Sequence, residues 1–281
     1  MSDGRDGYIH GTAPEEQRRL SRLNELLNGR SLARLRIRPD DRVLDVGCGL
    51  GQLTRAIARA SGAGGVVVGI ERSREQIAEG RRQAAGSGER VDIRQGDAAA
   101  PPLHAAEWGT FDVVHTRFLL EHLSEPQPVV DAMVRAARPG GRIVLEDDDH
   151  ELLRLFPPVP AFEAVWKAYM RTYQAGGRDP LVGRSLTVLL ARAGADPVAC
   201  DWPFFGACHG SPDWDVIVSN CRAIVTGART AIESAGIARA GFDEGLRAYD
   251  AWSGTRGSAF WYCTFWAEGV KPVPARPGSA D

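Results

Sequence analysis

A glycine-rich turn that follows an acid is the segment of this sequence most suggestive of chemistry. Residues 43–54 read VLDVGCGLGQLT, which predicts a short buried strand, a tight turn and the start of a helix. Gly47, Gly49 and Gly51 tolerate positive φ angles and let the main chain approach a ligand closely. Asp45 inside the strand would repel a pyrophosphate at this helix start. The pattern therefore favours a ligand that is cationic or carries hydroxyl groups.

More carboxylates stand at the ends of later predicted strands. The five predicted strands cover residues 43–46, 66–71, 91–95, 111–115 and 142–146. Glu71 ends the second of them and can accept hydrogen bonds from both hydroxyls of a ribose. Ser73, with Gln76 three residues on, predicts the cap of the next helix. Asp97 follows the third strand. Strand-to-helix units with acids at the carboxyl ends are typical of an open parallel sheet with its ligand in the crevice.

The acid-x-Gly-x-Gly-x-Gly run and the two later acids resemble the motifs of class I S-adenosylmethionine-dependent methyltransferases. The resemblance covers roughly residues 8–150 well and residues 180–270 in outline. It implies S-adenosylmethionine as the cofactor and S-adenosylhomocysteine as the product. It also implies that Glu71 binds the ribose and Asp97 the adenine amino group.

The cofactor site implied by this resemblance draws on several segments. Its expected residues are Tyr8, Arg19, Asp45, Gly47, Cys48, Gly49, Gly51, Gln52, Glu71, Arg72, Asp97, Ala98, Thr116, Arg117 and His122. Tyr8 resembles an N-terminal residue that folds over the bound cofactor, and Arg19 is a candidate partner for the cofactor carboxylate. The alternative is a loose terminus and a solvated helix face. His122 is expected near the methionine part of the cofactor, or is only a polar residue on a helix flank.

A helix outside the sheet is expected near the N-terminus. Thr12 is its expected cap, Pro14 lies in its first turn, and Glu15 completes a capping box. Asn28 and Gly29 are expected to close it, which makes it a plausible lid. The expected divisions are residues 1–30 for the lid segment, 31–270 for the methyltransferase domain and 271–281 for a flexible tail.

The composition changes beyond residue 150, where 17 of the 21 aromatic residues lie. Residues 260–266 predict a strand buried on both faces, placed antiparallel at the edge of the sheet beside a strand near 197–205. Insertions near 151–180 and 210–255 fall outside the expected sheet. We expect them to form a helical cap over an apolar, aromatic-lined acceptor pocket, the alternative being a merely structural cap.

Candidates for catalysis come from the same region and from the segments near the cofactor. The acidic run at 146–149, followed by His150, ends the fifth strand. The catalytic candidates are Glu146, Asp148, His122 and Tyr8. Alternation leaves open whether Glu146 or Asp148 points inward, and a solvated acidic turn is the alternative for most of these acids. His209 is a weaker candidate base. No metal is expected, since adjacent acids cannot all converge on one octahedral ion.

The composition also excludes several classes of function. The net charge of −2 gives no general attraction for nucleic acid or anionic membranes, and no window is apolar enough for a spanning helix. Five cysteines without a CxxC pair suggest neither a zinc site nor a disulfide framework. We therefore expect a cytoplasmic protein with a small-molecule acceptor and no nucleic-acid or membrane partner.

These expectations combine into one prediction. The fold class is α/β: a Rossmann-like, seven-stranded, mostly parallel sheet with an antiparallel edge strand, an N-terminal lid helix and a helical cap insertion. The function is methyl transfer from S-adenosylmethionine to oxygen, nitrogen or carbon of a small, largely apolar or aromatic acceptor, plausibly in natural-product biosynthesis. The alternative is a cyclase or rearrangement catalyst that binds the same cofactor without methylating. Asp45 and Asp97 disfavour a nicotinamide oxidoreductase, and the complete motif set disfavours a mere binding module.

Overall fold

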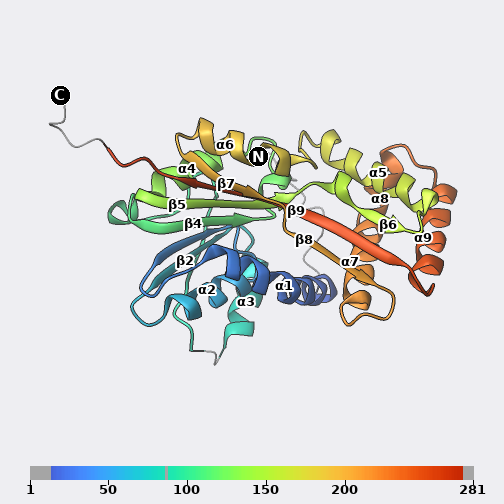
Figure 1. Cartoon of the computed structure of the whole chain (residues 1–281), viewed down its shortest axis with the longest axis horizontal. Helices are drawn as coiled ribbons and strands as arrows, with labels where there is room; N and C mark the ends of the chain where they lie inside the picture. Colours follow the sequence, from blue (N-terminus) through green and yellow to red (C-terminus); the bar gives the residue numbers. More distant parts are fainter. Residues whose placement is uncertain (1–13, 86–87, 275–281) are drawn as a thin grey trace, which may run out of the picture.

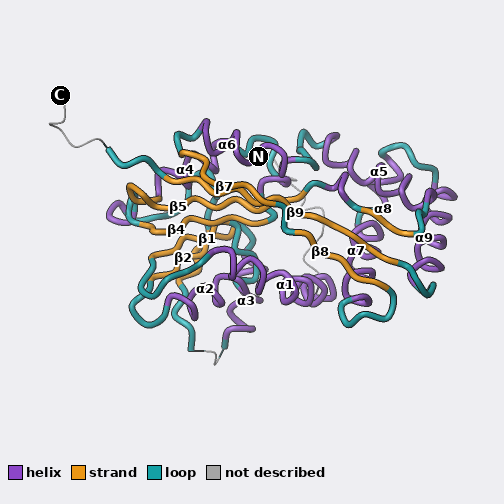
Figure 2. Tube along the Cα trace, in the orientation of Figure 1, coloured by secondary structure: helices purple, strands orange, loops and turns teal. Residues whose placement is uncertain are grey.

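The computed structural model describes residues 14–85 and 88–274, and it describes side chains from Glu25 onward. The strands are β1 (Arg42–Val46), β2 (Val66–Glu71), β3 (Asp92–Gln95), β4 (Phe111–Arg117), β5 (Ala137–Asp148), β6 (Arg154–Phe156), β7 (Asp196–Asp201), β8 (Phe204–Cys208) and β9 (Ala259–Val270). The α-helices are α1 (Pro14–Leu35), α2 (Gln52–Ser61), α3 (Arg74–Ala84), α4 (Gln127–Ala136), α5 (Pro160–Ala175), α6 (Leu186–Arg192), α7 (Trp214–Gly227), α8 (Arg229–Ser234) and α9 (Arg239–Ser253). Figures 1 and 2 show their arrangement.

The central sheet has the strand order β3-β2-β1-β4-β5-β9, in which the first five strands are parallel. β9 is antiparallel to β5 and continues beyond it into the helical cap (Figure 1). Its second half pairs with β5 on one side and β7 on the other. Its first half pairs with β6 and β8. β9 therefore joins the sheet to the cap.

The predicted α/β class with a mostly parallel sheet is confirmed, but two details of the sheet were wrong. Nine strands form in the described residues in place of seven, because β6 continues the line of β5 and β8 continues the line of β7. Pro203 separates β7 from β8, since proline has no N–H to donate to the ladder. The antiparallel strand also lies one position in from the edge, because β7 covers its outer side.

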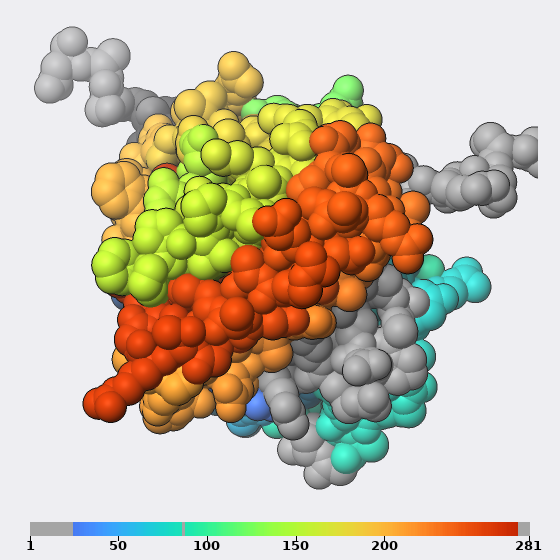
Figure 3. All heavy atoms as spheres, turned by 90° about the vertical axis from the view of Figure 1, so that its right-hand side faces the viewer, coloured from blue at the N-terminus to red at the C-terminus, as the bar shows by residue number. Residues whose placement is uncertain are grey.

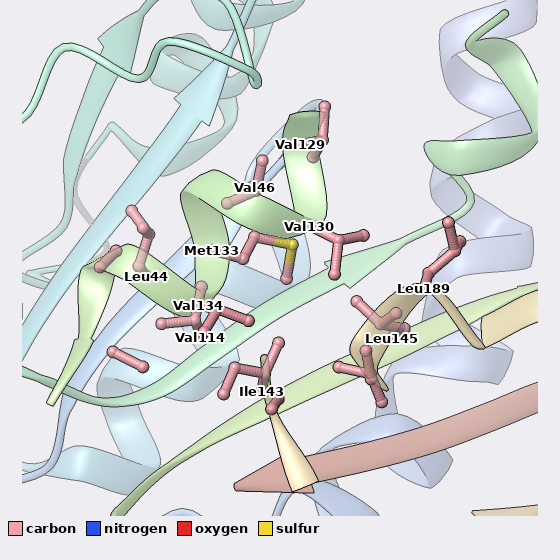
Figure 4. Packing of buried hydrophobic residues seen from close by; sticks show 14 of the residues in the cluster. Leu44, Val46, Val114, Val129, Val130, Met133, Val134, Ile143, Leu145 and Leu189 are labelled. Carbon is pink, nitrogen blue, oxygen red and sulfur yellow. The ribbon is translucent and has the colours of Figure 1, made fainter. Parts of the chain in front are cut away.

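Apolar packing fixes the sheet and the cap separately. One core cluster packs α4 and α6 against one face of the sheet (Figure 4). A smaller cluster packs α1 and α2 against the opposite face. The cap has its own cluster, in which aromatic side chains of α5 and α9 such as Phe162, Tyr169 and Tyr249 are fully buried. Figure 3 shows α5 beside the C-terminal helices on the cap surface.

The N-terminal helix is longer than predicted, because α1 continues past Asn28 and Gly29 to Leu35. Glycine inside a helix costs about 1 kcal/mol relative to alanine. Burial of Ser31 and Leu35 in the later turns offsets this cost. The guanidinium of Arg142 donates to the Leu35 carbonyl oxygen at 2.8 Å and so satisfies a terminal carbonyl. Tertiary contacts therefore override the local stop signal.

The predicted glycine turn and the Ser73 cap are confirmed, whereas Thr12, the predicted cap of α1, lies outside the described residues. Gly47, Gly49 and Gly51 have φ angles of 74°, 55° and 68°. The hydroxyl of Ser73 accepts the N–H of Gln76 and caps α3. In the portion of the chain that the structure describes, no helix combines the length and apolarity needed to cross a membrane.

Candidate active site

The glycine turn is held by a buried carboxylate at the end of β1. The hydroxyl of Thr54 donates to Asp45 Oδ2 at 2.6 Å, and His115 Nδ1 lies 2.9 Å from Asp45 Oδ1. Asp45 is only 3% exposed. Because both oxygens have protein partners, Asp45 ties β1 to the first turn of α2 and to β4. It also borders the cavity described below.

The acid at the end of β2 closes the other side of the turn. Glu71 Oε2 accepts the N–H of Gly49 at 3.0 Å, and Oε1 accepts the N–H of Ser73 at 2.8 Å. These two bonds hold the carboxylate beside the crevice between β1 and β2. The geometry thus places the glycine turn and the β2 acid at one edge of the sheet, as strand topology requires.

A cavity of about 700 Å³ runs from this turn to the helical cap. Most of the sequence-predicted cofactor residues border it: Asp45, Gly47, Cys48, Gly49, Gln52, Glu71, Arg72, Asp97, Ala98, Arg117 and His122. Asp148, a predicted catalytic residue, borders it as well. The volume is within the range of pockets that hold small organic ligands.

Other predicted residues do not border the cavity. Thr116 is fully buried and donates its hydroxyl to the Val46 carbonyl oxygen at 2.8 Å, so its expected contact with the cofactor is wrong. Gly51 does not border the cavity either. A Cβ at this position would lie 2.7 Å from the Ile93 side chain. Tyr8 lies outside the described residues, and the side chain of Arg19 is not among those described.

Glu146 is a second correction, because it faces α1 and does not border the cavity. Its Oε2 accepts the hydroxyl of Ser31 at 2.7 Å. Arg117 donates to the same hydroxyl oxygen at 2.9 Å and to Asn28 Oδ1 at 2.8 Å. Burial lowers the pKa of Arg117, while the Glu146 charge opposes that effect. Glu146 therefore helps to hold Arg117 and α1 beside the cavity, and a role for it as a base is not supported.

Asp148 is partly buried and belongs to a cluster of polar groups in the cavity wall, in which Glu121 and His150 are buried. His150 Nε2 lies 2.6 Å from Glu121 Oε2, and the Tyr262 hydroxyl lies 3.0 Å from His150 Nδ1. Burial raises the pKa of Glu121 to about 8 and lowers the pKa of His150. Burial first, and then the charge of Glu121, raises the pKa of Asp148 well above its usual range. The cluster therefore resists carrying net negative charge.

The wall of the cavity on the cap side is mainly apolar and aromatic. It is formed by Leu27, Leu153, Trp166, Tyr169, Phe205, Ile217, Asn220, Cys221, Ile224, Phe260 and Tyr262. His122 lies at the junction with the cofactor side, where its ring stacks on Tyr173 with centroids 5.9 Å apart. His209 is exposed and lies outside the cavity, so it is not a candidate base.

Polar atoms without partners mark the cavity as a binding site. Gln52 Oε1, His115 Nε2 and Asp148 Oδ1 are buried and lack hydrogen-bond partners among the described residues. All three residues border the cavity. Buried polar atoms without partners are rare in native proteins and commonly indicate a ligand or ordered water.

Comparison with known proteins supports the same interpretation. Residues 43–141 match the family model described as "Methyltransferase domain". Residues 43–141 therefore carry a methyltransferase domain, in agreement with the resemblance of the glycine motif to class I S-adenosylmethionine-dependent methyltransferases. This domain contains the glycine turn, Glu71 and Asp97, whereas the cap lies outside the matched residues.

Curated relatives match about half of this chain. An uncharacterized 37.1 kDa protein in transposon TN4556 of Streptomyces fradiae is 33% identical over 158 residues, or 56% of this chain and 44% of its own. Demethylmenaquinone methyltransferase of Shouchella clausii is 32% identical over 142 residues, or 50% of this chain and 54% of its own. The chain thus spans about half the length of these relatives.

Solved structures share the fold of this chain at low sequence identity. A putative methyltransferase from Bacillus halodurans has a TM-score of 0.58 at 16% identity, covering 88% of this chain and 99% of that one. The 4+2 cyclase SpnF has a TM-score of 0.52 at 23% identity, covering 90% of this chain and 80% of that one. At these identities the likeness concerns the fold alone.

Sequence reasoning missed the roles of three residues in the cavity wall: Glu121, His150 and Tyr262. Glu121 lies beside the predicted His122, and His150 follows the acidic run, so both stood in segments already noted. Their pairing depends on the meeting of the β4 and β5 ends, which no local pattern encodes. The sequence pattern around Tyr262 predicts only a strand buried on both faces and no role in the cavity wall.

Proposed function

We propose that this chain binds S-adenosylmethionine and transfers its methyl group to a small molecule held under the helical cap. The observation that carries the proposal is the single cavity that joins the glycine turn to the aromatic cap wall. A bound sulfonium would supply an already activated methyl group. The protein must then hold the acceptor in line with that group and exclude water, and orientation of this kind is worth about 7–11 kcal/mol.

The residues present fit this cofactor. Glu71 and Asp97 both border the cavity, which supports a role for Glu71 toward the ribose hydroxyls and for Asp97 toward the adenine amino group. Arg117 is partly buried, borders the cavity and suits the cofactor carboxylate. Gln52 and His115 offer partnerless polar atoms at the same end. These proposed roles agree with the cofactor that the resemblance of the glycine motif implies.

Calorimetric titration of the wild-type protein with S-adenosylmethionine, S-adenosylhomocysteine and NAD tests the proposal. We expect both sulfur compounds to bind and NAD not to bind. Asp45→Ala should lose most of this affinity, because it frees Thr54 and His115 from their shared partner. Asp131→Ala on the exposed side of α4 serves as the control. A folded wild-type protein, free of copurified ligand, that binds neither sulfur compound would contradict the proposal.

Product analysis separates methyl transfer from the non-methylating alternative. Only transfer releases S-adenosylhomocysteine, whereas a cyclase or rearrangement catalyst leaves the cofactor intact. A small, largely apolar acceptor, a place in natural-product biosynthesis, a cytoplasmic location and the division into residues 1–30, 31–270 and 271–281 are also proposals. The apolar and aromatic cap wall supports the first of these.

A further inference from the structure

The cavity wall contains more buried acid than the neighbouring side chains neutralise. Glu121 is 3% exposed, and its carboxylate, an oxygen of Asp148 and a ring nitrogen of His150 all lie within 4.8 Å of one another. Arg117 acts on Asp148 through its charge, but its guanidinium donates to Asn28 and Ser31 of α1. Buried carboxylates are costly unless they are paired or protonated.

Three members of this cluster already satisfy one another. Both ring nitrogens of His150 are engaged, one with Glu121 and one with the Tyr262 hydroxyl. One proton shared between Glu121 and His150 leaves that pair without net charge, whichever of the two carries it. Asp148 Oδ1, by contrast, is buried without a hydrogen-bond partner in the described part of the chain. The cluster thus has one open acceptor, and it belongs to a carboxylate.

Aromatic residues line the cavity that this open acceptor borders. The rings of Trp166, Tyr169 and Tyr262 border the same cavity. The rings of Trp166 and Tyr169 pack against His150 with centroids 5.6 and 5.5 Å from it. Aromatic faces attract organic cations, most strongly where water is excluded. A carboxylate with an open oxygen inside an aromatic wall is suited to an ammonium group on an apolar body.

The charge flow of methyl transfer favours the same class of acceptor. When a neutral amine attacks a sulfonium methyl, positive charge moves from sulfur to nitrogen. A carboxyl oxygen that accepts a hydrogen bond from the nitrogen then stabilises the charge that develops in the transition state. A hydroxyl acceptor that first ionised to an oxyanion would instead be opposed by the neighbouring acids.

We propose that the acceptor is an amine on an apolar or aromatic body, bound with its nitrogen against Asp148. This proposal rests on the proposed methyltransferase function. In the reaction, the ammonium gives one proton to Asp148 and becomes a neutral amine. The nitrogen lone pair then forms the N–C bond to the methyl group as the S–C bond breaks, and its electrons stay on sulfur. The products are the methylated ammonium and neutral S-adenosylhomocysteine.

A divalent metal is the competing occupant, because Glu121, Asp148 and His150 are potential ligands. The amine fits better, since a metal would have to break the 2.6 Å contact between Glu121 and His150. An N–H donor needs only the open oxygen of Asp148. The two occupants make different predictions for binding.

Matched probes test the proposal on protein saturated with S-adenosylhomocysteine. The pairs are phenethylamine with 2-phenylethanol and tryptamine with tryptophol, each titrated calorimetrically at neutral pH. We expect an amine to bind at least about tenfold more tightly than its alcohol, as a charge-assisted hydrogen bond implies. Asp148→Asn should remove the preference, and Glu151→Gln, a change of an exposed neighbouring acid, should preserve it.

Several outcomes would overturn the amine assignment. These are equal or tighter binding of the alcohols, a preference that survives Asp148→Asn, and no amine binding at millimolar concentration. Mn²⁺ binding that is lost in Asp148→Asn and that displaces the amines would reassign the cluster to a metal. The S-adenosylhomocysteine affinity of each variant reports its folding, and Asp148→Ser replaces Asp148→Asn if that affinity is lost.

Failure of the broader function gives a different result. If wild-type protein does not bind S-adenosylhomocysteine, the methyltransferase proposal fails, while the same probe pairs on ligand-free protein still report on Asp148. If S-adenosylhomocysteine binds and the amines show no preference, only the acceptor assignment fails.

Discussion

Glu71 combines two structural hydrogen bonds with a proposed contact to the ribose. Its carboxylate accepts the N–H groups of Gly49 and Ser73. Glu71→Ala removes charged hydrogen bonds, so affinity for S-adenosylhomocysteine should fall by about 1–3 kcal/mol, or roughly 5- to 150-fold. Calorimetry measures this, with Glu79→Ala, a change of a partly exposed acid on α3 that does not border the cavity, as the control. Wild-type protein that binds the 2′-deoxy analogue as tightly as the parent compound would rule out the ribose role.

The pKa of Glu121 predicts how stability depends on pH. Burial raises this pKa to about 8, so the native state retains a proton that the unfolded chain releases near its ordinary value of 4.5. Because the native state then binds more protons, stability falls as pH rises between these values, by at most about 1.4 kcal/mol per pH unit for this group. The melting temperature should therefore drop between pH 6 and pH 8 by roughly 2–4 °C per kcal/mol lost.

Glu121→Gln should flatten this pH dependence, because the amide does not titrate and keeps hydrogen-bonding capacity toward His150. Glu79→Gln, which changes a partly exposed acid on α3 whose pKa is lowered by its hydrogen bonds to Gln83 and Arg82, should leave it unchanged. Melting curves of the three proteins across the same pH series provide the measurement. A Glu121→Gln protein with the slope of the wild type would show that another buried acid, such as Asp147, dominates the titration.

At the scale of elements, α1 offers a test of how tertiary contacts extend a helix. Gly29 lies inside α1, and a Cβ there would meet no atom within 4 Å. Gly29→Ala should stabilise the protein by about 0.5–1 kcal/mol through helix propensity. Gly51→Ala should destabilise it, because φ is 68° and the new Cβ would approach Ile93 at 2.7 Å. Denaturant unfolding of both variants measures the difference, and a loss of stability in Gly29→Ala would contradict it.

The sequence predicted those features whose determining residues lie within a few positions of one another. The glycine turn and the Ser73 cap were predicted because their residues have conformational preferences of their own. The end of α1 was not predicted, because it depends on the burial of Leu35 and on a hydrogen bond to its carbonyl oxygen from Arg142, a residue 107 positions away. The same holds for Glu121 and His150, which meet only once β4 and β5 lie side by side. Pairings across the sheet are a property of topology and cannot be seen in one segment.

At the scale of the whole molecule, β9 and α1 link the methyltransferase layer to the cap. β9 pairs with β5 through one half and with β6 and β8 through the other. From α1, Leu27 borders the cavity, and Arg30 donates to the Phe204 carbonyl oxygen at 3.2 Å. Two layers that share a strand, a helix and a cavity should unfold together.

This coupling predicts how the cap responds to a ligand bound at the glycine turn. At about 100 times its dissociation constant, S-adenosylhomocysteine should stabilise the cooperative unit by about 2.7 kcal/mol. Fluorescence of the buried cap tryptophans Trp166, Trp214 and Trp252 should then shift together with far-ultraviolet circular dichroism, in one transition. Asp45→Ala, expected to bind the ligand poorly, should show little shift under the same conditions. Two separate transitions, with the tryptophan signal unmoved by the ligand, would mean that the cap folds independently and that the cavity does not couple the two layers.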